Sequence, residues 1–283
     1  MEPIITLYER EAAAHDTLPS ILATNYGGGF VLPHGERKRP YVIANFVETL
    51  DGIVSYNAPG QTGGGPISGD NPQDKMVMGL LRASADAVIF GSSSLRQDAN
   101  HPRIPAFISP TFAAEYATLR TQQGKRERMP ISVVMTASGK IDFNDRTFHT
   151  PGLRVVIATT AQGQAYLAQQ VLPDGTEVRI VETYGDEGEV SPEGVVLLLA
   201  QDYGVRVVLY EGGPTLLASF LAQGIVDELF LTLAPQVAGR DGDLHRLALV
   251  EGHAFMPVDA LWATLLSVKL AGSHLLLRYR FSR

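Results

Sequence analysis

Two short junctions in the sequence have the residue types and spacing to bind a phosphorylated ligand. The first is Gly212-Gly213-Pro214-Thr215, which follows the apolar run Val207–Tyr210 and precedes a helical pattern beginning near Leu216. Adjacent glycines let a pyrophosphate approach the backbone, and the free N–H groups of a first helical turn favour an anion. Pro214 at the helix start loses no useful hydrogen bond. This junction predicts a phosphate-binding turn, and a plain tight turn is the alternative.

The second junction is Gly91-Ser92-Ser93-Ser94, directly after the apolar residues 87–90. Small hydroxyl residues at the start of a helix either cap it or bind phosphate. Two such junctions on separate strands of one sheet fit a dinucleotide that lies across the carboxyl ends of the strands. Neither junction matches G-x-G-x-x-G, so the standard Rossmann fingerprint is absent.

The elements that must position these junctions alternate along the chain. Apolar, β-branched runs predict strands at 41–47, 87–91, 131–135, 155–158, 178–181 and 205–210. Helical patterns lie around Val77–Ser84, where Asp70 or Asn71 could cap the helix, and at 112–122, 162–170, 192–201 and 214–223. This alternation favours an α/β fold with a mostly parallel central sheet and helices on both faces. Strands at 228–234, 265–270 and 275–281 have tight connections and predict an antiparallel C-terminal end.

The domain organisation follows from where this alternation begins. Residues 1–39 have weak periodicity and are too few for an independent core, so we expect an N-terminal arm that lies on the main body. Residues 40–283 then form one domain. The segment from 59 to 69, rich in Gly and Pro, reads as a loop.

Composition excludes several classes of function. The chain has 283 residues, 23 basic and 30 acidic, with a formal net charge of −7, and no basic stripe that would track nucleic acid. It has no Cys, which excludes disulfides, thiolate nucleophiles and thiolate metal sites, and we expect no metal. No apolar run approaches the ~20 residues of a membrane span. We therefore expect a cytoplasmic protein with a small-molecule ligand.

Several segments, in order, resemble the reductase domain of riboflavin biosynthesis, a family with the dihydrofolate-reductase fold. They are Arg39-Pro40-Tyr41-Val42, Leu50-Asp51-Gly52, Leu81-Arg82-Ala83, Gly91–Ser94, Tyr210–Leu217 and Val226–Leu229. The similarity extends over about residues 39 to 282. It implies NADPH-dependent reduction of a phosphoribosylamino-pyrimidinone, as by 5-amino-6-(5-phosphoribosylamino)uracil reductase, which opens the ribose to a ribityl chain. His34-Gly35-Glu36 matches half of the zinc-deaminase motif of bifunctional relatives, but a chain without Cys lacks the other half, so we expect a stand-alone reductase.

The resemblance also implies the cofactor site. The phosphates of NADPH would be bound at Gly212, Gly213, Pro214, Thr215 and Leu216. The second junction would contribute Gly91, Ser92 and Ser94, with Asp98 just beyond it. Thr159 and Thr160 follow the strand 155–158, where hydroxyls often meet the 2′-phosphate.

The substrate-binding residues implied by the resemblance are Asn45, Glu48, Ser68, Arg103 and Glu211, with Lys75 and His101 nearby. Asn45 stands where the family commonly has Lys, and Glu48 where a small residue is usual. Glu211 matches a substrate-contacting acid, and a salt bridge or a helix N-terminal contact is its alternative role. The catalytic proton would come from Glu211 or from a water held by Asn45. A pterin or dihydrofolate-like substrate, or nucleotide binding without turnover, remain as alternative functions.

We also expect a homodimer. Residues 227–233 and 275–281 are apolar strands near the end of the predicted sheet, and an open edge of this kind invites pairing with a second copy. The resemblance points the same way. The alternative is that residues 1–39 fold back and cover that edge within one chain.

Overall fold

The computed structural model describes residues 1–13, 17–33, 37–58, 61, 63–183, 186–241 and 244–282. His34, Gly35 and Glu36, the half-motif noted above, lie outside these ranges. The strands are β1 (Ile5–Glu9), β2 (Tyr41–Glu48), β3 (Ile53–Ser55), β4 (Ala87–Gly91), β5 (Ile131–Thr136), β6 (Val155–Thr159), β7 (Thr176–Ile180), β8 (Glu182–Thr183), β9 (Asp186–Val190), β10 (Val207–Tyr210), β11 (Glu228–Leu233), β12 (Leu247–Ala248), β13 (Ala263–Ala271) and β14 (His274–Phe281).

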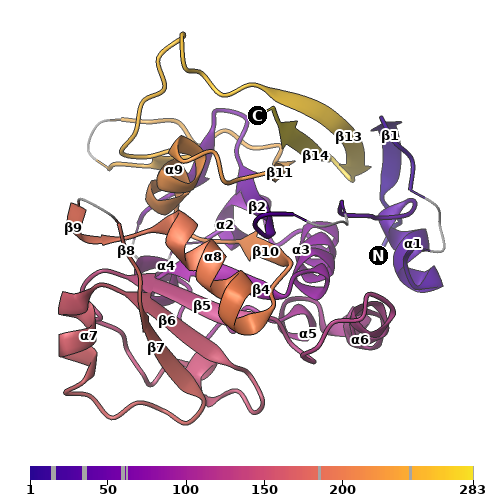
Figure 1. Cartoon of the computed structure of the whole chain (residues 1–283). Coiled ribbons are helices and arrows are strands. Elements are labelled where there is room, and N and C mark those ends of the chain that lie inside the picture. The colour runs from indigo at the N-terminus through magenta and orange to yellow at the C-terminus, as the bar shows by residue number, and fades with distance from the viewer. Residues whose placement is uncertain are drawn as a thin grey trace.

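Helices connect the strands on both faces of the sheet (Figure 1). They are α1 (Ser20–Tyr26), α2 (Gly65–Ser68), α3 (Pro72–Ser84), α4 (Ser92–Gln97), α5 (Pro105–Ile108), α6 (Ala113–Gln122), α7 (Ala161–Leu167), α8 (Pro192–Tyr203) and α9 (Pro214–Ala222), with 3-10 turns at Pro110–Phe112 and Arg146–His149. None of these helices has the length and apolar character that crossing a bilayer requires.

The central sheet has ten strands in the order β1-β13-β14-β11-β2-β10-β4-β5-β6-β7. The run from β11 to β7 is parallel throughout, whereas β14, β13 and β1 are antiparallel to their neighbours. The predicted mostly parallel sheet with antiparallel C-terminal strands is confirmed. One apolar core contains residues of α1, α3 and α6, and a second contains residues of α8 and α9. Both faces of the sheet are thus covered.

Helix α3 begins as its sequence predicts. Asn71 caps it, because its side-chain oxygen accepts hydrogen bonds from the backbone N–H groups of Gln73 (2.9 Å) and Asp74 (3.0 Å), and Pro72 occupies the first turn. Met76 and Leu80 are fully buried against the sheet. The segment from 59 to 69 was predicted as a loop, but its described part contains the single-turn helix α2.

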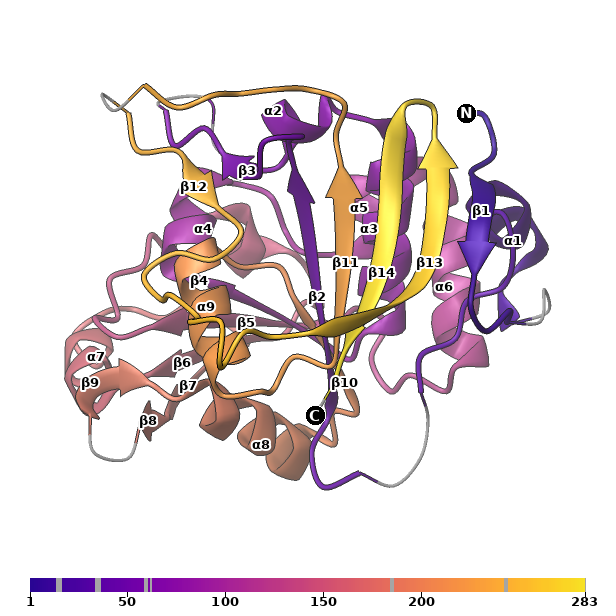
Figure 2. The ribbon, with the colours of Figure 1, turned by 90° about the horizontal axis from the view of Figure 1, so that it is seen from above.

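The N-terminal arm changes the expected edge of the sheet. Strand β1 pairs antiparallel with β13, and α1 buries Leu22 and Tyr26 in the same core as α3 (Figure 2). The expectation that 227–233 and 275–281 form an open edge is wrong, because β11 lies between β2 and β14, and β14 lies between β11 and β13. The arm covers that side of the sheet instead.

Candidate active site

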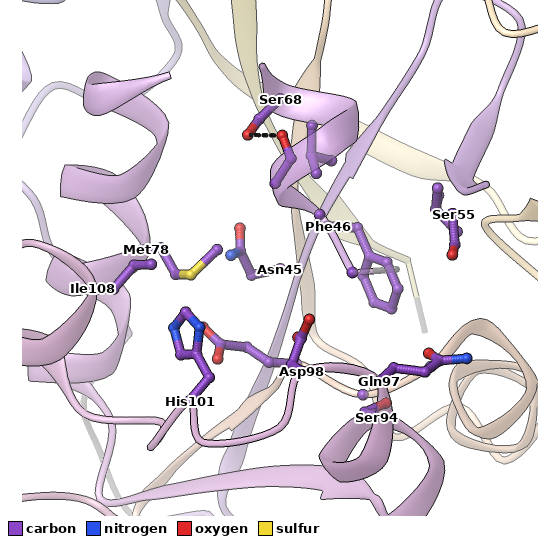
Figure 3. Close-up of a pocket in the computed structure, with 18 of the residues that line it drawn as sticks. Asn45, Phe46, Ser55, Ser68, Met78, Ser94, Gln97, Asp98, His101 and Ile108 are labelled. Atoms are coloured by element: carbon purple, nitrogen blue, oxygen red, sulfur yellow. Dashed lines mark hydrogen bonds between the residues drawn. The ribbon is translucent and has the colours of Figure 1, made fainter. Parts of the chain in front are cut away.

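A cavity of about 300 Å³ opens where β2, β4 and β10 end, beside α2, α3 and α4. Three adjacent parallel strands end here because β10 lies between β2 and β4 in the sheet. Many of the residues predicted from the sequence line this cavity together: Asn45, Ser68, Ser94, Asp98, Arg103, Glu211, Gly212, Gly213 and Pro214. Figure 3 shows Asn45, Ser68, Ser94, Asp98 and His101 around it.

The two glycine junctions face each other at one end of the cavity. A Cβ atom added to Gly213 would lie 3.5 Å from the Ser94 hydroxyl oxygen, and one added to Gly91 would lie 3.9 Å from Leu216. Gly91 and Gly213 are the N-cap residues of α4 and α9. The β4–α4 and β10–α9 turns therefore form one continuous surface, although Gly91, Ser92, Thr215 and Leu216 do not line the cavity itself.

Tyr210 stabilises the turn that follows β10. Its hydroxyl donates to the backbone carbonyl of Gly213 (2.6 Å), and its ring stacks on Phe46 at 6.1 Å. A Cβ atom at Gly212 would collide with the Tyr210 ring. Gly212 is thus required by the packing of the turn, whereas a Cβ atom at Gly213 would make only an ordinary van der Waals contact with Ser94.

Thr159 and Thr160 are not brought to the cavity. The Thr159 hydroxyl is fully buried and donates to the carbonyl of Thr136 (2.7 Å). The Thr160 hydroxyl donates to the carbonyl of Ala137 (2.8 Å) and accepts from Gly163 N–H (3.1 Å), which caps α7. Both hydroxyl groups thus attach the end of β6 to the end of the neighbouring strand β5.

Glu48 also lies outside the cavity. It is the last residue of β2, and its backbone carbonyl accepts from Ala234 N–H (2.8 Å). Burial raises the pKa of its carboxyl group. Ser68 does line the cavity, but its hydroxyl donates back to the carbonyl of Gly65 (3.3 Å).

Glu211 forms a buried ion pair with Arg82. The Arg82 Nε atom lies 3.1 and 2.9 Å from the two carboxylate oxygens, and an Nη atom lies 2.8 Å from one of them. The side chains are 6% and 3% exposed. The salt-bridge role considered for Glu211 is therefore present in the structure, at the cavity wall.

Arg103 has an internal partner too. Its guanidinium donates to Asp98 (3.0 Å) and to the carbonyl of His101 (2.8 Å), and it lies over the Phe90 ring at 5.1 Å. Burial lowers the pKa of Arg103. The predicted phosphate partner is therefore already joined to Asp98, the acidic residue predicted near the cofactor.

Asn45, Met78 and His101 all line the cavity (Figure 3). Neither the Asn45 amide nor the His101 Nε2 atom has a hydrogen-bond partner within the described part of the chain. Burial, with the nearby charges of Arg82 and Arg103, lowers the pKa of His101 to about 3, which leaves its imidazole neutral.

Asp74 was not among the predicted site residues, yet it is buried at the same cavity and accepts a hydrogen bond from the Thr232 hydroxyl. An acidic residue in the first turn of a helix is explained by the helix dipole alone, so the sequence carried no signal for it. Among the described residues, no three His, Asp or Glu side chains gather as metal ligands would.

A sequence model of the RibD C-terminal domain matches residues 40–254. Over 220 residues the chain is 28% identical to the 2,5-diamino-6-ribosylamino-4(3H)-pyrimidinone 5′-phosphate reductase of Archaeoglobus fulgidus, covering 77% of this chain and 89% of that protein.

Two solved structures share the fold. A pyrimidine reductase-like protein from Corynebacterium diphtheriae superposes with a TM-score of 0.66 at 21% identity, covering 86% of this chain and 92% of that one. A diaminohydroxyphosphoribosylaminopyrimidine deaminase/5-amino-6-(5-phosphoribosylamino)uracil reductase from Thermotoga maritima gives 0.60 at 19%, covering 87% and 57%. The predicted reductase fold of the dihydrofolate-reductase type is thereby confirmed.

Proposed function

The chain belongs to the RibD C-terminal domain family, and from this membership we propose that it is an NADPH-dependent reductase of a ribosylamino-pyrimidine 5′-phosphate. Members of this family are reductases of riboflavin biosynthesis, and reductases of this kind generally use a pyridine nucleotide. The observation that supports the proposal most is the joining of the β4–α4 and β10–α9 turns with Asn45 and Glu211 around one cavity.

The cofactor would bind along the surface formed by the two turns. The absence of a side chain at Gly213, next to the Ser94 hydroxyl, would let a pyrophosphate approach the backbone. The half-buried Ser92 side chain has no hydrogen-bond partner in the described ranges, so its hydroxyl is available to a phosphate oxygen. Thr159 and Thr160 would first have to leave the hydrogen bonds that they make now.

The bound nicotinamide would supply a hydride to the sugar carbon that carries the amine nitrogen, in the ring-opened imine form of the substrate. A proton must then reach the nitrogen to complete the ribitylamino product. Both carboxyl oxygens of Glu211 accept hydrogen bonds from Arg82, which suits Glu211 to orient substrate rather than to donate that proton. The unpartnered amide of Asn45 can hold a water that relays the proton.

An assay of NADPH oxidation tests this proposal directly. We expect oxidation with the ribosylamino-pyrimidine 5′-phosphate and none with dihydrofolate. Oxidation with dihydrofolate alone would instead assign a pterin-like substrate. NADPH binding without oxidation by either compound would show a nucleotide-binding protein without turnover.

The choice of NADPH over NADH has its own test. At equal concentrations, NADPH should raise the melting temperature more than NADH, because its 2′-phosphate adds contacts that stabilise the folded state. Thermal unfolding with each cofactor measures this. Equal shifts would contradict the preference for NADPH.

We further propose that the chain forms a homodimer through a surface other than β11 and β14. The segment before β13 exposes Val258 (94%) and Trp262 (77%), with Met256 and Leu261 nearby. Exposed apolar side chains gathered on one segment are typical of a protein interface.

A further inference from the structure

The cavity contains a buried carboxyl group that the proposed hydride transfer does not use. Asp74 lies in the first turn of α3 and is 6% exposed, yet it lines the cavity. The Thr232 hydroxyl, on β11, donates to its Oδ1 atom (2.6 Å). In the described part of the chain, its Oδ2 atom has no hydrogen-bond partner.

In the part of the chain that the structure describes, no basic side chain forms an ion pair with this carboxyl group. Three basic residues of the cavity each have another carboxylate: Lys75 pairs with Asp70, Arg82 with Glu211, and Arg103 with Asp98. The ring of His274, on β14, is bonded through Nδ1 to Asn71 and through Nε2 to the carbonyl of Ser68.

Burial therefore dominates the titration of Asp74. It raises the pKa of the carboxyl group, with Glu211 acting in the same direction, while Thr232, His274 and Lys75 act against it. A buried carboxyl group without a cation is costly for the folded protein, and side chains of this kind concentrate at functional sites. Two N–H donors from a ligand would offset that cost.

We propose that Asp74 binds the 2-amino edge of the substrate pyrimidine and so selects a 2-amino-4-oxopyrimidine over a uracil. This rests on the proposed function. A carboxylate only accepts hydrogen bonds, and a 2-amino-4-oxo ring presents an amino N–H and a ring N–H side by side, which match its two oxygens. A uracil presents one N–H between two carbonyls, so a carbonyl oxygen would face a carboxylate oxygen.

This mismatch explains why the site should reject the uracil ring. A site built to bind donor groups rejects an analogue that lacks them, because its own buried polar atoms are then left unpaired. The ring therefore still carries its 2-amino group when this chain acts on it.

Asp74→Asn tests the inference, because an amide offers one acceptor and one donor, the pattern that matches a uracil edge. We expect the unaltered chain to prefer 2,5-diamino-6-ribosylamino-4(3H)-pyrimidinone 5′-phosphate over 5-amino-6-(5-phosphoribosylamino)uracil by at least tenfold in kcat/KM. Asp74→Asn should reverse that order. Asp202→Asn, on the exposed side of α8, is the matched control and should leave the ratio unchanged.

Calorimetry with the two ribitylamino products separates this inference from the proposed function, because binding does not require turnover. If neither substrate oxidises NADPH, the proposed function fails, while tighter binding of the 2-amino product by the unaltered chain and of the uracil product by Asp74→Asn still supports Asp74. Equal affinity for both products, or the same preference in both proteins, would overturn the inference.

Thr232 acts here as a positioning residue. Thr232→Val removes the donor that favours the charged form of Asp74, so the pKa of Asp74 should rise further. A group with a raised pKa loses its charge as the pH falls through that pKa, so the 2-amino preference should disappear at a higher pH in Thr232→Val. A purely structural role would lower kcat/KM for both substrates by the same factor at every pH.

Discussion

Gly212 and Gly213 are adjacent but perform different tasks. Gly213 has an ordinary φ of −72°, so a side chain there brings no left-handed strain, and its Cβ would meet only ordinary contact at Ser94. Gly212 is packed against Tyr210, so a side chain there would disturb the turn itself. A substitution at Gly213 should therefore affect cofactor binding, whereas a substitution at Gly212 should affect folding.

Gly213→Val should lower NADPH affinity at least tenfold, about 1.4 kcal/mol, because the valine side chain keeps the pyrophosphate away from the backbone. The melting temperature should change little. Titration of cofactor fluorescence measures the affinity, and Gly212→Val is the comparison variant, expected to lower the melting temperature. Unchanged NADPH affinity in folded Gly213→Val would show that this glycine pair is only a turn.

Glu211→Gln should destabilise the chain by about 3–5 kcal/mol, because it leaves the buried Arg82 without its counter-charge. Urea unfolding measures the loss. Glu177→Gln is the matched control: its pair with Arg179 is 36% and 40% exposed, and exposed pairs contribute up to about 1 kcal/mol. Similar losses in the two variants would argue against a special role for burial at Glu211.

At the scale of elements, the long α/β alternation was predictable, and several short elements were not. The run at 41–47 and the helix capped by Asn71 are strong patterns, and both are present with close boundaries. Helix α2 has four residues and β12 has two, and tertiary contacts rather than a local period decide elements this short. The partners of a side chain are also set by the fold, which is why the Thr159 and Thr160 bonds and the Asp74 site had no signal in the sequence.

The N-cap of α3 links stability to the cavity. Asn71→Ala should cost about 1 kcal/mol, because the N–H groups of Gln73 and Asp74 lose their acceptor. It also frees the His274 ring nitrogen that Asn71 contacts at 3.0 Å. Chemical denaturation measures the loss, and Ser191→Ala at the start of α8, a residue that does not line the cavity, is the control cap. We expect equal losses of stability but a rise in substrate KM only for Asn71→Ala.

At the scale of the whole molecule, β11 and β14 are interior strands of the sheet and cannot form the expected dimer contact. We therefore expect the two copies to meet at the segment before β13. Light scattering of the full chain should give twice the 30.6 kDa of one copy. Trp262→Glu should give the mass of a single copy, because a charge on this exposed apolar segment disfavours its burial. Leu7→Glu, on β1, is the control and should remain dimeric. A single-copy mass for the unaltered chain would refute the dimer.

The pairing of β1 with β13 also has a consequence for how the chain folds during synthesis. Ile5 is registered against Leu270, and Glu9 against Ser267, so these contacts close one of the longest loops that the chain allows. The parallel core from β2 to β10 can assemble earlier, from segments that have already left the ribosome. Strand β1 must wait, unpaired, until β13 emerges. Folding should therefore end with a slow, high-contact-order step in which the two distant segments join.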